Sequence, residues 1–335
     1  MCTLLSDVAS CFGWDALSTP GEACCSCIIG QCCCLCCLRC LSSQRRAANA
    51  IASRDPMLVV LSSSSRAAAR VIGRSFAGTS STDPEQTINW ALGPQLKDLG
   101  DDITHRRRVD VATFWMSFAT HMTGDQGVVI GAKHDTSPDG LGAVIVARRF
   151  GSLSEIENAG TSASTGAVIC RYVCTGGMPE VYTSKDLESI KTPMDDRSQK
   201  VLTPMLKKAH VESGLGPHWC VEVMAVDPSA QGSKHCSRLM RAVTAQADAE
   251  GIPTFLEASG QRNKAIYEHF RFREVANYTC ELEGDEAGSE PFKEAYAMVR
   301  PVGGGEGGGG SSSSSSSSSN AEAVAVEEMQ RDNAV

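Results

Sequence analysis

The stretch of this sequence best suited to chemistry is the segment VDPSAQGSKHCSRLM, which begins at Val226. A run of β-forming residues leads into a turn at Pro228, and a helical pattern opens at about Lys234. The turn between them offers successive backbone N–H groups at the start of a helix, where the helix dipole also favours negative charge. The pattern therefore predicts room for a diphosphate, although an ordinary strand–turn–helix connection would look the same.

The elements that must position this turn follow from hydrophobic periodicity. The body of the protein is expected to begin near Pro56. Spacing of apolar residues predicts helices over 66–76, 109–122, 200–211 and from about 234, with a short helix carrying Tyr267. Alternating or continuous apolar runs predict a hairpin of 127–132 and 141–147, and strands at 219–226, 253–258, 274–281 and 295–300. Residues 151–166 and the acidic stretch 284–290 read as loops, and 167–174 as a strand or an insertion.

Composition narrows the functional classes. The formal net charge of −8 argues against general nucleic-acid binding, because phosphate contacts need an excess of Lys and Arg. A hydrophobic fraction of 42% is enough for a globular core. A basic secretory n-region is missing at the N-terminus, so we expect a cytoplasmic body. From Gly303 onward, glycines, nine consecutive serines and an acidic tail predict disorder.

Eleven of the 16 cysteines lie within the first 40 residues, in a head that is followed by Arg45 and Arg46. Three interpretations stay open for this head. Reversible S-acylation beside basic residues would attach the chain to a membrane face. A metal site would need better spaced ligands than CC-x-C and CCC-x-CC provide, so no metal is expected. The third interpretation is a disordered extension. A spanning helix is not expected, since Gly30, Gln31 and Arg39 interrupt the apolar stretch.

A set of motifs follows in order and without a gap between His218 and Glu281: the HW pair, a strand ending V-x-P, the QG turn, a helix ending GIP, the LEAS strand and the RNxxxYExxxF helix. In these motifs the sequence resembles the GNAT superfamily of acetyl-CoA-dependent N-acetyltransferases, and within it the puromycin N-acetyltransferase type that acts on small molecules. The closing AYAMVR strand fits the same family. The resemblance implies an α/β fold, a mixed and mostly antiparallel sheet of about seven strands with helices on both faces. Its central strands, here 219–227 and 253–259, should splay apart in a V.

The resemblance also implies a binding mode for acetyl-CoA as co-substrate. Its pantetheine arm would lie in the V against the backbone of Met224, Ala225 and Val226. Its pyrophosphate would lie over the turn, which comprises Gln231, Gly232, Ser233, Lys234, His235, Cys236 and Ser237. In this chain Lys234 and Cys236 occupy the two glycine positions of the family's turn motif, and Arg271 stands for the glycine of a later Gly-Phe pair.

Catalytic roles are implied in the same way. Tyr267 stands where many members carry a general acid for the leaving thiolate. Asn263, one helical turn earlier, would hold the pantetheine or orient Tyr267. Glu222 stands where some relatives project a general base, and Glu257 is the reserve candidate. Direct transfer to a small-molecule amine in a ternary complex is expected, without a covalent enzyme intermediate.

The expected organisation is a cysteine-rich segment over 1–55, an N-acetyltransferase domain over 56–301 with its core motifs at 218–281, and a disordered tail over 302–335. Two alternatives to the enzyme remain open. One is a GNAT-fold regulatory or scaffolding module that binds acyl-CoA weakly or not at all. The other places the main function in membrane attachment through the cysteine-rich head. The acceptor amine and the oligomeric state are not indicated by the sequence.

Overall fold

The structure is a computed structural model that describes residues 44–62, 65–77, 90, 109, 112–113, 127–157, 201–280 and 292–304. The predictions for residues 1–43 of the cysteine-rich segment, for residues 167–174 and 284–290, and for the C-terminal tail from residue 305 onward lie outside these residues, as does most of the predicted helix at 109–122. Residues Val302–Gly304, at the start of the predicted tail, form the short 3-10 helix η5. Within the described part of the chain, no helix is long and apolar enough to cross a membrane.

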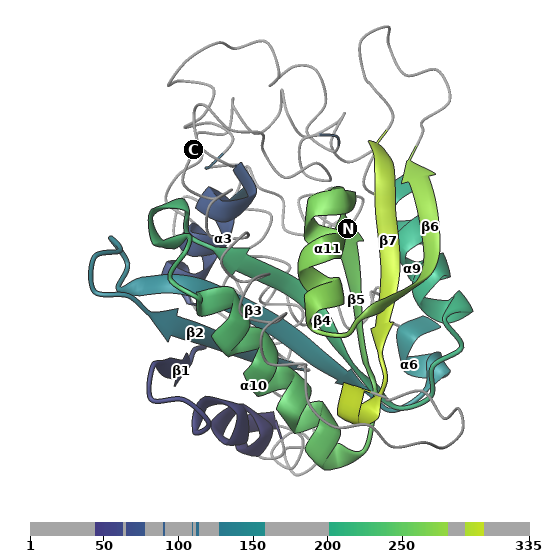
Figure 1. The fold of residues 1–335 in the computed structure, drawn as a ribbon, viewed down its shortest axis with the longest axis horizontal. Coiled ribbons are helices and arrows are strands. Elements are labelled where there is room, and N and C mark those ends of the chain that lie inside the picture. The colour runs from purple at the N-terminus through teal and green to yellow at the C-terminus, as the bar shows by residue number, and fades with distance from the viewer. Residues whose placement is uncertain are drawn as a thin grey trace, which may run out of the picture.

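The described strands form one seven-stranded sheet in the order β1-β2-β3-β4-β5-β7-β6 (Figure 1). Neighbours are antiparallel except β4 and β5, which run parallel. The strands are β1 (Leu58–Val60), β2 (Gly127–Lys133), β3 (Leu141–Phe150), β4 (His218–Val226), β5 (Thr254–Ser259), β6 (Arg273–Cys280) and β7 (Phe292–Arg300).

Helices cover both faces of this sheet. On one face α10 (His235–Glu250) and α11 (Gly260–His269) pack on a core that contains Trp219, Leu256 and Met298. This face, toward the viewer in Figure 1, is called the α10 face below. On the opposite face, the α9 face, α3 (Arg66–Ala77) packs over β3 and β4, while α6 (Leu153–Glu157) and α9 (Thr203–Glu212) pack around Phe255. The predicted mixed, mostly antiparallel α/β sheet with helices on both faces is confirmed.

Helix α10 shows how the sequence builds the element that carries the turn. Its buried residues Leu239, Met240, Val243 and Ala247 recur three or four positions apart, which puts them on one side of the helix. The helix ends at Gly251, whose left-handed backbone (φ 68°) lets its N–H bond the carbonyls of Ala247 and Asp248. Its buried side therefore fixes the direction in which its N-terminus points.

Most predicted elements are present with small shifts of their ends, and two regions differ. Residues 44–52 form a helix whose Ala48 and Ile51 are buried in the core of the α10 face, so the body begins before the predicted start at Pro56. The predicted loop at 151–166 contains the short helix α6, which buries Ile156 against Phe150 and Phe255. In both cases apolar packing on the core stabilises a segment whose own periodicity is too short to predict it.

Candidate active site

The sheet opens between β4 and β5. Their parallel pairing joins Trp219 to Thr254, Cys220 to Phe255 and Val221 to Leu256, and it stops there, although β4 continues to Val226 and β5 to Ser259. The predicted V-shaped splay is therefore present, with its apex just beyond Val221 and Leu256. We call the space between the diverging ends the V opening.

A β-bulge lies at the apex. On the side of β3, Ala147 pairs with Val221 and Val146 with Val223, so Glu222 is the extra, unpaired residue of β4. A bulge increases the local twist of its strand and turns two consecutive side chains to one face. Here it turns β4 away from β5 and places Glu222 on the same face as Val223, which packs under α3.

Backbone groups of β4 line one edge of the V opening. The N–H of Asp227 donates to the carbonyl of Gly142 at the start of β3 (2.8 Å). Because backbone groups of successive residues face opposite edges of a strand, those of Met224 and Val226 face the opening. The backbone of Ala225 instead faces β3, where this residue pairs with Val144. Of the three residues expected to contact pantetheine, two thus present their backbone to the opening.

Helix α3 contributes a contact that the sequence did not indicate. The N–H of Val226 donates to Oγ of Ser75 at 3.2 Å. Ser75 is 151 residues away in the chain, and a serine near the end of a helix carries no signal of such a role. One hydrogen-bond donor of the open edge is thus already occupied in the free protein.

The turn after β4 has the geometry of an anion site. The four residues from Gln231 to Lys234 are exposed, and Gly232 (φ 78°) and Lys234 (φ 61°) are left-handed. Helix α10 starts at the next residue, and the Lys234 side chain does not cap it. The first N–H groups of the helix have no intrahelical acceptor, so they point to the space in front of the helix. Lys234 thus adopts a left-handed backbone conformation that glycine takes more easily than lysine.

The three residues that open α10 are buried to different degrees. His235 is 4% exposed, and its Nε2 lies 3.1 Å from Nδ1 of His134. Burial, His134 and Arg238 together lower the pKa of His235. Cys236 is half-buried against the core of the α10 face, where burial raises the pKa of its thiol to about 11. Its side chain therefore packs inward as a neutral thiol, and Ser237 is half-buried beside it.

The helix with the candidate acid borders the V opening on the α10 face. Tyr267 is half-buried, packs against the same core as Met224 and Val226, and has its ring edge-on to Phe272 at 6.1 Å between centroids. Asn263 donates through Nδ2 to the carbonyl (2.9 Å) and Oγ (3.3 Å) of Ser259. Asn263 thus fastens the start of α11 to the end of β5.

Two carboxylates lie on the other side of the splay. Glu222 and Glu257 directly follow the last paired residues of β4 and β5, so they are neighbours across the apex. Glu257 shares the α9 face with Phe255, two residues earlier in β5. Burial and the charge of Glu222 raise the pKa of Glu257 to about 8, although its side chain keeps some exposure to solvent. Glu222 is exposed. The candidate bases, Glu222 and Glu257, are thus on the α9 face, and the candidate acid, Tyr267, is on the α10 face.

A metal centre is not indicated by the described residues, among which no group of three or more His, Cys, Asp or Glu side chains is placed to hold an ion.

No protein-family model matches the chain, and no curated protein sequence matches it significantly. Several solved structures are similar to its fold. Arylalkylamine N-acetyltransferase 2 from Aedes aegypti is 14% identical with a TM-score of 0.39, covering 73% of this chain and 98% of that one. The polyamine N-acetyltransferase of Drosophila melanogaster is 9% identical with a TM-score of 0.41, covering 72% and 96%. A Corynebacterium glutamicum structure described as histone acetyltransferase HPA2 and related acetyltransferase is 13% identical with a TM-score of 0.36, covering 73% and 96%. Similarities this distant assign no activity, so function has to follow from the geometry of the site itself.

Proposed function

We propose that this chain is an acetyl-CoA-dependent N-acetyltransferase of the GNAT superfamily that transfers acetyl to a small-molecule amine within a ternary complex. The observation that carries the proposal is the continuity between the open edge of β4 and the N-terminus of α10. Backbone groups of Met224 and Val226 face the V opening, and the next residues lead directly into the exposed turn. A ligand with amide groups at one end and a diphosphate at the other would match this track.

Each half of the track suits one half of acetyl-CoA. The amides of the pantetheine arm would bond the free edge of β4 as an added strand does. The diphosphate would accept from N–H groups at the start of α10, where the helix dipole also favours it. The Lys234 ammonium, on an exposed side chain beside those groups, would add a positive charge.

The proposed reaction then runs across the opening. The acceptor nitrogen attacks the thioester carbonyl carbon, the C–N bond forms, and the C–S bond breaks with its electron pair leaving on sulfur. The nitrogen loses a proton to Glu222, directly or through water, and the CoA thiolate takes a proton from the Tyr267 hydroxyl. The products are the acetylated amine and CoA, and solvent returns both residues to their starting states.

The carboxylate pair supports Glu222 as the base. A pKa of about 8 keeps Glu257 mostly protonated at neutral pH, so Glu222 is the member left to accept a proton. The neutral Glu257 also limits the negative charge at the apex to that of one carboxylate. The pair would therefore favour a cationic amine, which would lose one proton to Glu222 before it attacks and a second proton to solvent as the amide forms.

A matched pair of tyrosine variants tests the proposal after acetyl-CoA binding has been measured by calorimetry. Acceptor amines would be screened by thiol release, and Tyr267→Phe compared with Tyr296→Phe. Tyr296 packs in the same core, and its hydroxyl accepts from Gln261 at 2.6 Å. Losing a general acid should lower turnover by about a hundredfold or more, whereas Tyr296→Phe should stay close to the unmodified protein. Equal rates in both variants would show that Tyr267 only packs.

A second function is favoured by the two changes at the cofactor track, Lys234 in a glycine position and Ser75 on the N–H of Val226. The fold would then serve as a regulatory or scaffolding module with weak or no acyl-CoA binding. Calorimetry separates the two, because no binding at millimolar acetyl-CoA would exclude the enzyme. The puromycin-type acceptor class remains part of the proposal.

Membrane attachment by S-acylation of the cysteine-rich head also remains a prediction. It is tested by membrane association that hydroxylamine releases and that deletion of residues 1–43 abolishes. A full-length protein that stays entirely in the soluble fraction would contradict it.

A further inference from the structure

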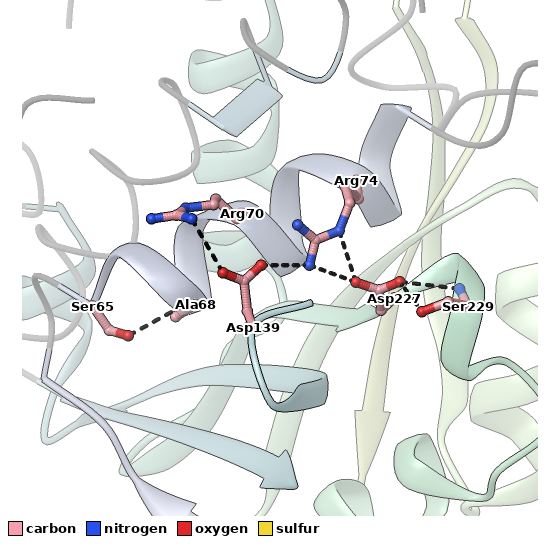
Figure 2. A network of polar contacts seen from close by, with 7 residues as sticks. All are labelled: Ser65, Ala68, Arg70, Arg74, Asp139, Asp227 and Ser229. Carbon is pink, nitrogen blue, oxygen red and sulfur yellow. Dashed lines mark hydrogen bonds and ion pairs between the residues drawn. The ribbon is translucent and has the colours of Figure 1, made fainter. Parts of the chain in front are cut away.

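The residue between β4 and the diphosphate turn, Asp227, carries a buried charge. Its side chain is 3% exposed. Oδ1 accepts the N–H (3.0 Å) and the hydroxyl (2.7 Å) of Ser229, and Oδ2 accepts Nε of Arg74 (2.8 Å), as Figure 2 shows. Burial alone would raise the pKa of Asp227, but these bonds outweigh it and lower the pKa. Asp227 is therefore a fully bonded carboxylate that fixes the first residues of the turn.

Arg74 of α3 links this carboxylate to a second one. Its Nη2 lies 2.6 Å from Oδ2 of Asp227 and 2.8 Å from Oδ2 of Asp139, which belongs to the turn between β2 and β3 (Figure 2). Burial would lower the pKa of Arg74, but the two carboxylates raise it. One guanidinium therefore joins three separate parts of the chain: helix α3, the β2–β3 hairpin and the entry to the turn.

The same network sets the charge at the entry to the proposed diphosphate turn. Asp227 carries a negative charge at the residue that leads into the turn, and Asp139 carries a second one beside the same guanidinium nitrogen of Arg74. Arg74 offsets one of these charges, and Arg70 approaches Asp139 only at 3.3 Å with a side chain that is 55% exposed. Without Arg74, two poorly compensated carboxylates would lie at the entry to the turn, and the bond that holds Asp227 to α3 would be lost. Both effects would weaken the binding of a diphosphate. The uncompensated carboxylates would repel it, and the loss of the Asp227 bond would displace the N–H groups that should bind it.

We propose that Arg74, through Asp227 and Asp139, is a positioning residue that sets the geometry and the charge of the diphosphate turn. This inference rests on the proposed binding of acetyl-CoA. Arg74 acts at a distance from the thioester, so it should govern how well the nucleotide end is bound and leave the chemical step unchanged.

Arg74→Gln and Arg70→Gln form a matched pair for the test, since both are arginines of α3 one helical turn apart. Steady-state kinetics would use acetyl-CoA and S-acetylpantetheine, which has the same thioester but no diphosphate. For Arg74→Gln we expect KM for acetyl-CoA to rise by roughly tenfold to a hundredfold, with kcat and the kinetics of S-acetylpantetheine unchanged. Arg70→Gln should stay within about twofold of the unmodified protein, as exposed substitutions do.

The outcomes separate this inference from the proposed function. Absence of acetyl-CoA binding in the unmodified protein would overturn the proposed function itself. Binding that is equally strong in Arg74→Gln, or a loss shared by acetyl-CoA and S-acetylpantetheine, would overturn only the positioning role. If Arg74→Gln does not fold, Arg74→Lys keeps the charge but not the fork of two donors, and an intermediate rise in KM for acetyl-CoA alone is expected.

Discussion

A buried histidine pair at the closed end of the V makes a quantitative prediction about stability. His210 of α9 and His218 of β4 are joined through their Nε2 atoms at 2.7 Å, and the Nδ1 of His218 lies 2.7 Å from the Gly216 carbonyl. A carbonyl can only accept, so His218 donates through Nδ1, and its Nε2 accepts from His210. His210 also stacks on Phe255 at 4.2 Å between ring centroids. Burial lowers the pKa of both histidines, so both rings are neutral in the folded protein at neutral pH.

The magnitude follows from the pKa of His210. Burial, His218 and Arg148 lower it from 6.5 to about 3. In the unfolded chain His210 therefore takes up a proton near pH 6.5, whereas in the folded chain it does so only near pH 3. The protein consequently loses stability as the pH is lowered from about 6.5 to about 3. Between pH 7 and pH 5 the loss from His210 alone is about 2 kcal/mol. At higher pH the effect vanishes, since both states are then neutral.

Glu257 acts in the opposite direction over the same range. Its folded pKa is raised to about 8 from 4.5, so the folded state binds a proton first and gains stability as the pH falls from 8 toward 4.5. From pH 7 to pH 5 this gain is on the order of 2 kcal/mol, which offsets the loss from His210 in the unmodified protein. The histidine effect is therefore visible only as a difference between two proteins.

The assay compares urea unfolding of the unmodified protein and His210→Gln at pH 7 and pH 5. Glutamine can still donate to Nε2 of His218, but it does not titrate. The variant lacks the loss of stability that His210 causes on acidification. The change in its free energy of unfolding from pH 7 to pH 5 should therefore be about 2 kcal/mol more positive than that of the unmodified protein. An identical pH dependence of the two proteins would refute the reasoning, because His210 would then not be held neutral by folding.

Three further predictions concern the site. Lys234→Gly should raise the free energy of unfolding by about 0.5–1 kcal/mol, because it removes the cost of a left-handed lysine. As a control, Lys208→Gly within α9 should lower the free energy of unfolding by about 1 kcal/mol. If urea unfolding shows that both variants are less stable than the unmodified protein, Lys234 is not strained. Ser75→Ala should free the N–H of Val226, so the affinity for acetyl-CoA measured by calorimetry should rise by about two- to fivefold. Weaker binding would instead mean that Ser75 itself contacts the cofactor. Glu257→Gln should remove a group that titrates near pH 8 from the pH dependence of turnover, and an unchanged profile would separate Glu257 from the reaction.

Local features of the sequence were enough to predict much of the fold. The periodicity of residues 66–76, the hairpin of 127–132 and 141–147, and the strand–turn–helix after His218 each reflect contacts within one element or its neighbour. The family resemblance also indicated where glycine would be expected. At two of those places, Lys234 and Arg271, the backbone is left-handed although the residue is not glycine. The resemblance therefore indicated the backbone conformation at these two positions, although neither residue is glycine.

What the sequence could not reveal are contacts between distant segments. Strand register makes Glu222 and Glu257 neighbours, the packing of α3 brings Ser75 to Val226, and Arg74 meets an aspartate 153 residues later in the chain. Each of these contacts depends on the relative placement of several elements, which no periodicity within one element records. The sequence by itself thus determined the strand, turn and helix after His218, and its family resemblance named a candidate acid and base. Only the tertiary structure decided which side of the opening each one faces and which buried charges hold the turn, because these depend on how the sheet splays and which helix covers it.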